Sequence, residues 1–361
     1  MQLPLSEEHT AFVKTLRRIV EDSCEVAPRP EPSDATPAFD SKLWDSLHGS
    51  GYLEAVSGPE GDGVLLGLLA EVVGRYLAPV PLLSSVVLAG TVLSEAAPQD
   101  PLTVAVQTGE QIAALCLDSL VTAPTVSGVD VEGLDTSRTV TGTVQSVLGA
   151  THAHQLLFVV GEGDEVELLS AAVMSGVERA PRMFDPSRDV AAVTVHSAPA
   201  RRIASGPRVR EAVRRAIHVA ALVEACEMTG AAQAALDLTV EHLKTRRQFG
   251  RAIGSFQALQ HACAIIAVEN EAALAASRAA CRAHDDGSDQ FELQALVAKS
   301  VAADAIDRAA RGALQMHGGM GFTWEVDAHR YLRRARSARG RLFSPDACRA
   351  RIAEAVMVAD A

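Results

Sequence analysis

The sequence is poor in aromatic residues and in positive charge. Phenylalanine, tryptophan and tyrosine make up only 4% of its 361 residues, whereas apolar residues as a whole reach 48%, much of it alanine. This balance favours closely packed helices over an all-β sandwich. The 33 basic residues against 45 acidic ones give a formal net charge of −12. A general affinity for nucleic acid is not expected, because an acidic surface repels phosphate. Any anion site must therefore be local.

Paired cysteines and long apolar runs are missing as well. The six cysteines are scattered, with no CxxC pair and no short spacing to histidine, so neither a zinc site nor a disulfide framework is indicated. The N-terminal segment MQLPLSEEHTAFVKTL turns acidic at once, and no apolar run is long enough to span a membrane. We therefore expect a cytoplasmic protein with reduced cysteines, no metal site and no membrane partner.

Three kinds of pattern follow one another along the chain. Residues 5–23 place apolar side chains at helical spacing behind Ser6, a residue type that caps helices, and the first hundred residues read as helical. Short apolar or β-branched runs follow: TVAVQ, AALCL, LLFVV, VELLSAAV and VAAVTV, separated by turn signals such as VSGVD, VTGT and GEGDE. From Val209 the helical period returns as one long helix, with further helices expected at 256–284, 289–316 and 325–339.

This order predicts an α+β chain with three domains. They are an N-terminal helical domain at 1–100, a middle β domain at 101–204 and a C-terminal four-helix bundle at 205–361. The alanine bias of residues 272–314 indicates close helix-to-helix packing, because alanine is the best helix former and permits close axes.

The stretch TRRQFGRAIGSFQALQH, residues 245–261, gathers Arg246, Arg247 and Arg251 around Phe249 at the corner between two expected helices. Guanidinium groups beside a helix N-terminus suit a phosphate, because fixed donors and the positive end of the helix dipole act on the same anion. An arginine cluster in a loop is also commonly a solvated turn, so this stretch alone does not distinguish a phosphate site from a solvated turn.

A second stretch, QMHGGMGFTWEVD at 315–327, interrupts the alanine-rich helix with glycines. Glycine lets the backbone come close to a ligand, while Gln315 and His317 supply polar contacts from the helix end. The alternative is a glycine-rich turn without a ligand.

Together the two stretches resemble the C-terminal domain of the acyl-CoA dehydrogenase family. The resemblance is carried by RRQFG and IGSFQ, then QxHGGxGFTWE and YLRRAR further along the chain, with LSEEHTAFVKTLRRIV and GRYLAPVPLL as additional family-like segments. It implies a flavoprotein fold of N-terminal helices, a middle β domain and a C-terminal four-helix bundle through which subunits pair.

The same resemblance implies a cofactor site. In the family, the first arginine of the RxxFG motif reaches the pyrophosphate of FAD held by a neighbouring subunit, and the aromatic residue of the motif packs by the cofactor. These roles fall on Arg246 and Phe249. The residues implied to line the same dinucleotide are Gln257, Gln315, Gly318 and Gly319.

The implied reaction is the α,β-dehydrogenation of an acyl-CoA thioester, with electrons passed on to an acceptor like electron-transfer flavoprotein. A glutamate removes the α-proton while the β-hydrogen leaves as hydride to the flavin. Laying this sequence on the family places Leu342 and Ala220 at the two usual locations of that glutamate. Neither side chain can take a proton, so the usual base is missing.

Glu224 is the candidate for a displaced base, because it lies one helical turn from Ala220 on the same face. The alternative for Glu224 and its neighbour Glu227 is a polar contact inside the bundle, a charge on the helix surface, or an ion pair with Arg214, Arg215 or a partner chain.

The middle domain departs from the family pattern too. The segment that normally covers the flavin ring and acyl-CoA reads CLDSLVTAPTVSG at 116–128, where Thr122, Thr125 and Ser127 remain as donors. With its missing base and its changed segment at 116–128, the chain resembles one subunit of the actinobacterial α2β2 acyl-CoA dehydrogenases that act on steroid-CoA thioesters. That resemblance implies a chain that completes the FAD site of a second acyl-CoA dehydrogenase subunit and lacks its own base.

Two alternatives remain open at this stage. One is a self-sufficient homo-oligomer that uses a displaced base such as Glu224. The other is a family-derived protein without a redox role, which uses its bundle only for assembly. The basic segment RRARSARGR, 333–341, is interpreted as a solvated helix end or a subunit contact and not as a nucleic-acid site.

Overall fold

The computed structural model describes residues 5–26, 38–58, 61–117, 128–133, 138–174, 176–181 and 184–359. The chain forms two compact units. The bundle unit comprises Met1–Cys24, Gly63–Ala78 and Ala221–Ala361, and the sheet unit comprises Glu25–Asp62 and Pro79–Ala220. Across the described residues, no helix combines the length and the apolar character needed to cross a membrane.

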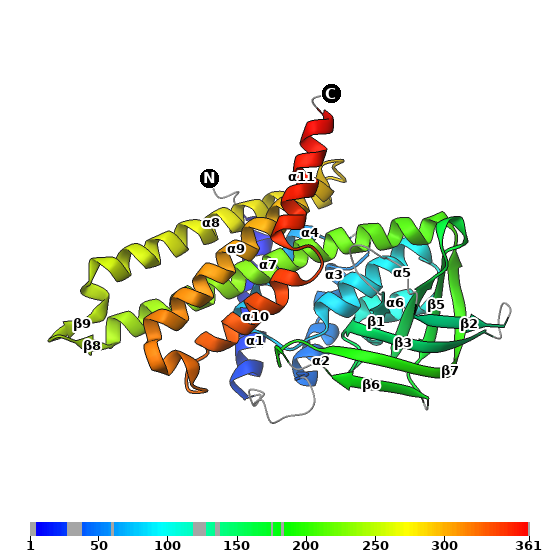
Figure 1. The fold of residues 1–361 in the computed structure, drawn as a ribbon, viewed down its shortest axis with the longest axis horizontal. Coiled ribbons are helices and arrows are strands. Elements are labelled where there is room, and N and C mark those ends of the chain that lie inside the picture. Colours follow the sequence, from blue (N-terminus) through cyan, green and yellow to red (C-terminus); the bar gives the residue numbers. More distant parts are fainter. Residues whose placement is uncertain are drawn as a thin grey trace. The chain divides into compact units, whose positions relative to one another are not determined.

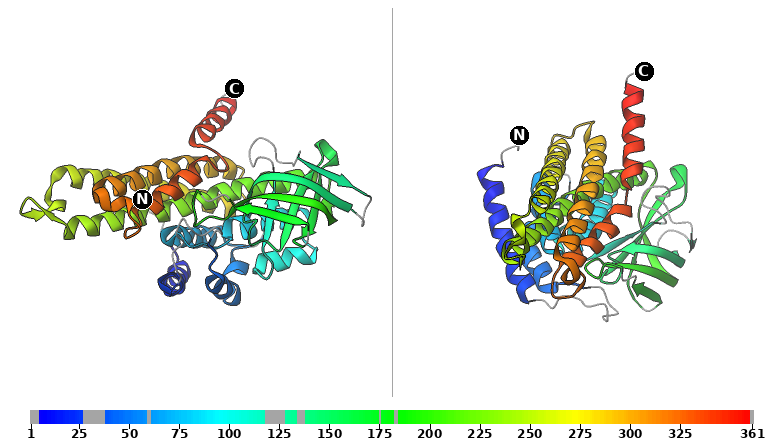
Figure 2. Two further views of the ribbon diagram at one scale, coloured as in Figure 1. Left: turned by 60° about the horizontal axis from the view of Figure 1, so that its bottom comes forward. Right: turned by 60° about the vertical axis from the view of Figure 1, so that its left-hand side comes forward.

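Long helices make up the bundle unit (Figure 1). In chain order its elements are α1 (Glu7–Val26), α4 (Gly63–Tyr76), the later part of α7 (Pro207–Thr245), β8 (Arg247–Gln248), β9 (Arg251–Ala252), η3 (Ile253–Ser255), α8 (Gln257–Asp285), α9 (Phe291–His317), η4 (Gly318–Phe322), α10 (Ala328–Gly340) and α11 (Pro345–Ala359). The four helices expected after residue 205 are confirmed to within a few residues. Within this unit, α11 extends away from the other helices (Figure 2).

Small residues bring the helices of the bundle unit into backbone contact. A Cβ added at Gly74 of α4 would lie 2.0 Å from the carbonyl oxygen of Glu227, and one added at Gly230 of α7 would lie 1.9 Å from that of Glu71. No Cβ fits at such distances, so glycine is required where α4 crosses α7. Buried alanines continue this close packing in α8 and α9: Ala273, Ala280, Ala298, Ala302, Ala305 and Ala309. The packing role predicted for the alanine bias is confirmed.

The sheet unit combines short helices with a seven-stranded sheet. Its helical elements are α2 (Ser41–Gly49), α3 (Tyr52–Ala55), η1 (Leu82–Ala89), α5 (Gly90–Ala96), α6 (Pro101–Thr108), η2 (Gly163–Glu165) and the first part of α7. Its strands are β1 (Ala113–Cys116), β2 (Val129–Glu132), β3 (Arg138–Leu148), β4 (Gln155–Val160), β5 (Glu167–Ala172), β6 (Val177–Pro181) and β7 (Val190–Ser205).

The sheet has the strand order β1-β4-β5-β7-β3-β2, with β6 also paired to β7. Among the strands that the structure describes, β1 and β4 pair in parallel, and the other pairs of this sheet are antiparallel. The long strand β7 joins the two halves of the sheet, since its end pairs with β5 and its first part pairs with β3 and β6. Phe158, Leu156 and Val193 are among the fully buried side chains of its core. The predicted order of helices, strands and helices is confirmed.

Two local predictions were wrong. The run TVAVQ, expected as a strand, lies inside α6. Asp100 caps that helix, accepting a hydrogen bond from the amide of Leu102 at 3.0 Å, and Pro101 occupies its first position, which together start a helix. The stretch VTGT, expected as a turn, lies inside β3. There Gly142 has a φ of +146°, and the pairing register shifts beside it, so the glycine marks an irregularity within the strand.

Candidate functional site

The arginine stretch folds into a short hairpin at the end of α7. The amide of Arg246 donates to the carbonyl of His242 at 2.9 Å, and the amide of Ile253 donates to the carbonyl of Arg246 at 2.9 Å. The turn consists of Phe249 and Gly250, with φ values of +53° and +77°. A two-residue hairpin turn needs left-handed backbone at both positions, which glycine adopts freely and an aromatic residue does not.

Phe249 is therefore a strained residue on the surface. It is 90% exposed, and among the described residues its one ring contact is an edge-on one with Phe256 at 6.1 Å between centroids. A left-handed non-glycine residue costs about 1 kcal/mol or more. Strain of this kind with no compensating burial points to a role outside the folded chain itself.

Two of the arginines at this corner have no acidic partner. Within the described part of the chain, Arg246 and Arg247 form no ion pair, and both are exposed. Arg251 instead lies over the ring of Phe256, with its guanidinium carbon 4.1 Å from the centroid. Elsewhere in this acidic chain many arginines pair with carboxylates, such as Arg138 with Glu167. The unpaired guanidinium groups of the hairpin fit an external anion.

The start of α8 adds free backbone donors beside the hairpin. Gln257 is its first residue, and the preceding Phe256 offers no side-chain cap. The amides of Leu259 and Gln260 donate to the carbonyl of Phe256 at 3.1 and 3.2 Å, so among the first amide groups those of Gln257 and Ala258 remain available to an anion. The side chain of Gln260 is already engaged, donating to the carbonyl of Gly254 at 2.9 Å.

The glycine stretch ends α9 with an open backbone. Gly318 follows the last residue of that helix with φ of 61° and ψ of −138°, a conformation that favours glycine. A Cβ added at Gly318 or at Gly319 would meet no atom within 4 Å. Gln315 is exposed on the last turn before them. A ligand could thus approach the backbone here without a side chain in the way.

Two histidines join the two stretches. The rings of His242, in the last turn of α7, and His317, the last residue of α9, are stacked with centroids 4.3 Å apart and planes 24° apart. Arg246 lies one turn beyond His242, and Gly318 follows His317 directly. The structure therefore brings the arginine stretch and the glycine stretch to one end of the bundle unit, as expected for parts of a single site.

The two residues predicted to stand at the family's base locations are apolar and buried. Leu342, just after α10, is 6% exposed and has a φ of +56°. Ala220, within α7, is 0% exposed. Neither position carries a group that could move a proton.

Glu224 is locked in a buried ion cluster. Its Oε2 accepts from Nζ of Lys299 at 2.7 Å, and its Oε1 accepts from Nε of Arg341 at 2.6 Å. Lys299 also donates to the carbonyl of Ala338 at 2.7 Å. Burial alone would raise the pKa of Glu224, but the charges of Lys299 and Arg341 outweigh it and lower that pKa. The partners expected for Glu224, Arg214 and Arg215, are not the ones it has.

Both oxygens of Glu224 are thus occupied by cations, and its side chain is fully buried. A general base must reach the proton that it removes, so this geometry does not favour a catalytic role. Glu227 is buried as well and lies 3.7 Å from Arg334, with both side chains 2% exposed. The polar contact inside the bundle, expected as the alternative for both glutamates, is present.

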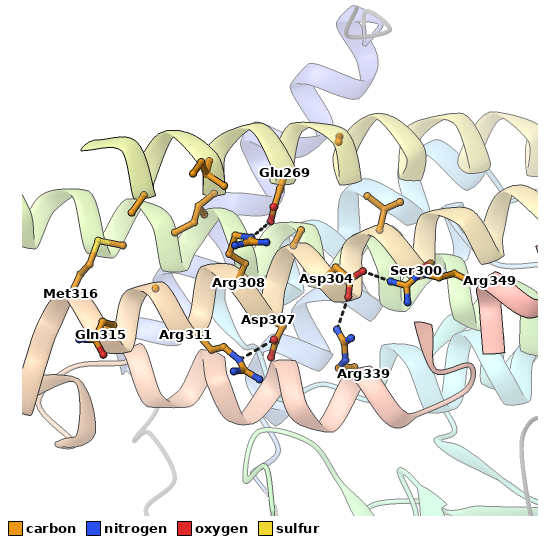
Figure 3. A pocket seen from close by; sticks show the side chains of 17 residues that line it. Glu269, Ser300, Asp304, Asp307, Arg308, Arg311, Gln315, Met316, Arg339 and Arg349 are labelled. Atoms are coloured by element: carbon orange, nitrogen blue, oxygen red, sulfur yellow. Dashed lines mark hydrogen bonds and ion pairs between the residues drawn. The ribbon is translucent and has the colours of Figure 1, made fainter. Parts of the chain in front are cut away.

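A groove of about 910 Å³ runs along α8 and α9 to the start of α11. Figure 3 shows Gln315 and Met316 at one end of it and Arg349 at the other. Its acidic side chains are neutralised by arginines: Glu269 by Arg308, Asp307 by Arg311, and Asp304 by Arg339 and Arg349. The groove therefore offers apolar side chains between closed ion pairs, and among its described lining residues no carboxylate is unpaired.

Three predicted donors cannot be placed. Thr122, Thr125 and Ser127 lie outside the described residues, which resume at Gly128. Of the other residues that matter here, His242, Lys299 and Arg341 were missed at the sequence level. A lysine inside the alanine-rich run of α9 was the one available signal, since lysine is seldom buried without a partner.

Comparison with known proteins identifies the family. Residues 210–340 match the family model described as acyl-CoA dehydrogenase, C-terminal domain. The chain is 34% identical over 307 residues to acyl-CoA dehydrogenase FadE34 of Mycobacterium tuberculosis, which covers 84% of this chain. The chain belongs to the acyl-CoA dehydrogenase family. It spans only 40% of the length of FadE34.

Two further similarities extend over nearly the whole chain. Acyl-CoA dehydrogenase IpdE2 of Mycobacterium tuberculosis is 29% identical over 320 residues, which cover 85% of this chain and 84% of that one. The solved structure of a variant of the Tcur3481–Tcur3483 steroid ACAD superposes with a TM-score of 0.83 at 27% identity, covering 98% of this chain and 99% of the other. The acyl-CoA dehydrogenase fold predicted from the two motifs is thereby confirmed.

Proposed function

We propose that this chain is the subunit of a heteromeric acyl-CoA dehydrogenase that completes the FAD site of a partner subunit and supplies no catalytic base. One observation carries the proposal. The end of the bundle presents unpaired arginines and open glycines, whereas both family base locations hold buried apolar residues. The chain keeps the means to bind a dinucleotide and has lost the means to remove a proton.

The residues at the bundle end divide the work of binding. Arg246 supplies positive charge for the pyrophosphate of FAD, and the free amides at the start of α8 add donors for the same anion. Phe249 offers an exposed ring for packing against the cofactor. Gln257, Gln315, Gly318 and Gly319 line the dinucleotide through amide groups and exposed backbone. Bound FAD would supply the acceptor for hydride from the β-carbon of the acyl-CoA.

The partner subunit removes the α-proton. Because Leu342 and Ala220 cannot ionise and Glu224 is neutralised by two cations, the carboxylate for the α-proton must come from another chain. The similarity to a steroid ACAD formed by two named proteins supports this division and suggests a steroid-type CoA thioester as the substrate. Electrons would then pass to an acceptor like electron-transfer flavoprotein.

The long face of α8 supplies a surface for that partner. Ile265, which lines the groove, is 51% exposed, and Val268, one turn further along α8, is 70% exposed. Exposed apolar side chains gain from being covered. The paired charges of the groove, such as Glu269 with Arg308, could be buried without leaving a charge unmatched.

The test is flavin stoichiometry with molecular mass, for the chain purified alone and for the chain co-expressed with an acyl-CoA dehydrogenase encoded beside it. We expect little flavin on the chain alone and about one flavin per pair of chains with the partner. Arg246→Ala should lower the flavin content of that complex. Lys244→Ala is the matched control, since it removes a cation from the same helix end that is already paired with Glu241.

A homo-oligomer with one flavin per chain that oxidises an acyl-CoA by itself would contradict the proposal. In that case Glu224→Gln should abolish the oxidation, as a displaced base requires. Flavin content that Arg246→Ala leaves unchanged in every assembly would instead favour a protein without a redox role.

A further inference from the structure

The stacked histidines lie at the point where the two halves of the proposed FAD site meet. His317 is 6% exposed, and its Nδ1 lies 2.7 Å from the carbonyl oxygen of Ala313. A carbonyl can only accept, so Nδ1 of His317 carries the hydrogen and the ring is held in one orientation. His242, stacked on this ring, is half-buried and has no hydrogen bond from its ring nitrogens among the described residues.

The side chains that shift the pKa of His242 are both basic. Burial, His317 on α9 and Arg246, just after the end of α7, each lower the pKa of His242. No carboxylate is among the described groups that shift it. Burial and the charge of Arg246 therefore both disfavour the protonated form of His242.

An anion beside Arg246 would reverse this effect. Negative charge at that point favours the protonated form of an imidazole one helical turn away, and it also offsets the repulsion from Arg246. We propose that His242 takes up a proton when the diphosphate of a flavin dinucleotide binds beside Arg246, and that His317 positions the His242 ring for this role. The inference rests on the proposed function, and it adds a pH dependence to the affinity for the dinucleotide.

The direction of the pH dependence follows from the linkage between proton uptake and binding of the dinucleotide. A complex that holds one proton more than its free components becomes tighter as the pH falls, by at most about tenfold per pH unit for one proton. The affinity changes over the pH range between two pKa values of His242. The lower one is the pKa without ligand, which lies below the usual value, and the higher one is the pKa that His242 acquires beside the anion. The diphosphate of FAD is a diester that does not titrate in this range, so FAD itself does not produce the slope.

The experiment is calorimetric titration of FAD into the deflavinated assembly at pH 6, 7 and 8. A second buffer of different ionisation enthalpy at each pH reports proton uptake directly. For the unmodified chain we expect the Kd for FAD to fall about three- to tenfold from pH 8 to pH 6, with net proton uptake. His242→Gln should bind with the pH 8 affinity throughout and without that uptake. His261→Gln, on an exposed histidine of α8 outside the stack, is the matched control and should keep the slope.

A variant of His317 tests separately whether this residue positions the ring of His242. His317→Ala removes the ring that positions His242, so it should weaken binding at pH 6 more than at pH 8. An equal loss at both pH values would mean that the pair only packs the two stretches together and would overturn the role given to His317. Circular dichroism of each variant separates these outcomes from misfolding.

FAD binding and its pH dependence distinguish a failure of this inference from a failure of the proposed function. Binding of FAD that is weakened by Arg246→Ala but shows the same pH dependence with and without His242 would overturn the inference alone. Absence of FAD binding at every pH, in every assembly, would overturn both.

Discussion

Glu224 and Lys299 form a fully buried ion pair, with the carboxylate oxygen 2.7 Å from the ammonium nitrogen and neither side chain exposed. The pair joins α7 to α9, and Arg341 adds a second cation at the point where α10 ends. A carboxylate in this setting stabilises the bundle by holding three segments together. The residue considered as a displaced base is thus part of a buried ion cluster.

Removing one member of the cluster should destabilise the protein strongly. Lys299→Met leaves the buried carboxylate of Glu224 with one cation in place of two, and breaking a buried pair in this way costs about 3–5 kcal/mol. The midpoint of urea unfolding measures the loss. Lys244→Met, which breaks the exposed pair with Glu241, should leave the midpoint nearly unchanged. Equal effects of the two variants would refute the structural role of the cluster.

Glu71 should make stability depend on pH. Burial raises its pKa from 4.5 to about 7, although Arg278 and Arg17 act in the opposite direction. Between those values the folded state keeps a proton that the unfolded state has lost, so the free energy of unfolding falls as the pH rises, by up to about 3 kcal/mol. Thermal unfolding from pH 5 to pH 8 checks this.

Glu71→Gln is the variant for that experiment, because its amide oxygen can still accept from Arg278. The difference in stability between the unmodified chain and Glu71→Gln isolates Glu71 from histidines that titrate in the same range. A difference that stays constant with pH would show that Glu71 has an ordinary pKa.

The crossing of α4 and α7 should tolerate no side chain at Gly230. Gly230→Ala places a Cβ 1.9 Å from the carbonyl oxygen of Glu71, which forces the helices apart and should cost about 2 kcal/mol or more. Gly340→Ala is the control, since a Cβ there meets no atom within 4 Å, and alanine is the better helix former. The two melting temperatures should move in opposite directions.

Phe249 should lower the stability of the folded chain while increasing its affinity for FAD. Phe249→Gly removes a left-handed aromatic residue that is 90% exposed, so the melting temperature should rise or stay level, by a free energy of up to about 1 kcal/mol. The flavin content of the assembly should fall, because the ring proposed to pack by FAD is gone. Phe184→Gly, at another exposed phenylalanine, should leave the flavin content unchanged. A loss of stability in Phe249→Gly would show that the turn is not strained.

Sequence reasoning succeeded where the signal was local. The long helix α7 and the two helices after it follow from apolar periodicity, and their ends are marked by hairpin and glycine chemistry at Phe249–Gly250 and Gly318. It failed at TVAVQ, where a cap at Asp100 and a proline outweighed a β-branched composition. It also could not assign partners to Glu224, because periodicity shows that a residue faces inward without showing what it meets.

The sequence by itself determined the family and the order of helices and strands, and it supplied the two stretches of the proposed FAD site and the prediction that the usual base is missing. Each of these depends on residue types at short spacing, and short-range rules suffice for them. Only the tertiary structure decided that Glu224 is neutralised by Lys299 and Arg341, 75 and 117 residues away, and that His242 stacks on His317. These pairings are set by how helices cross, and the crossings depend on the packing of the whole bundle unit.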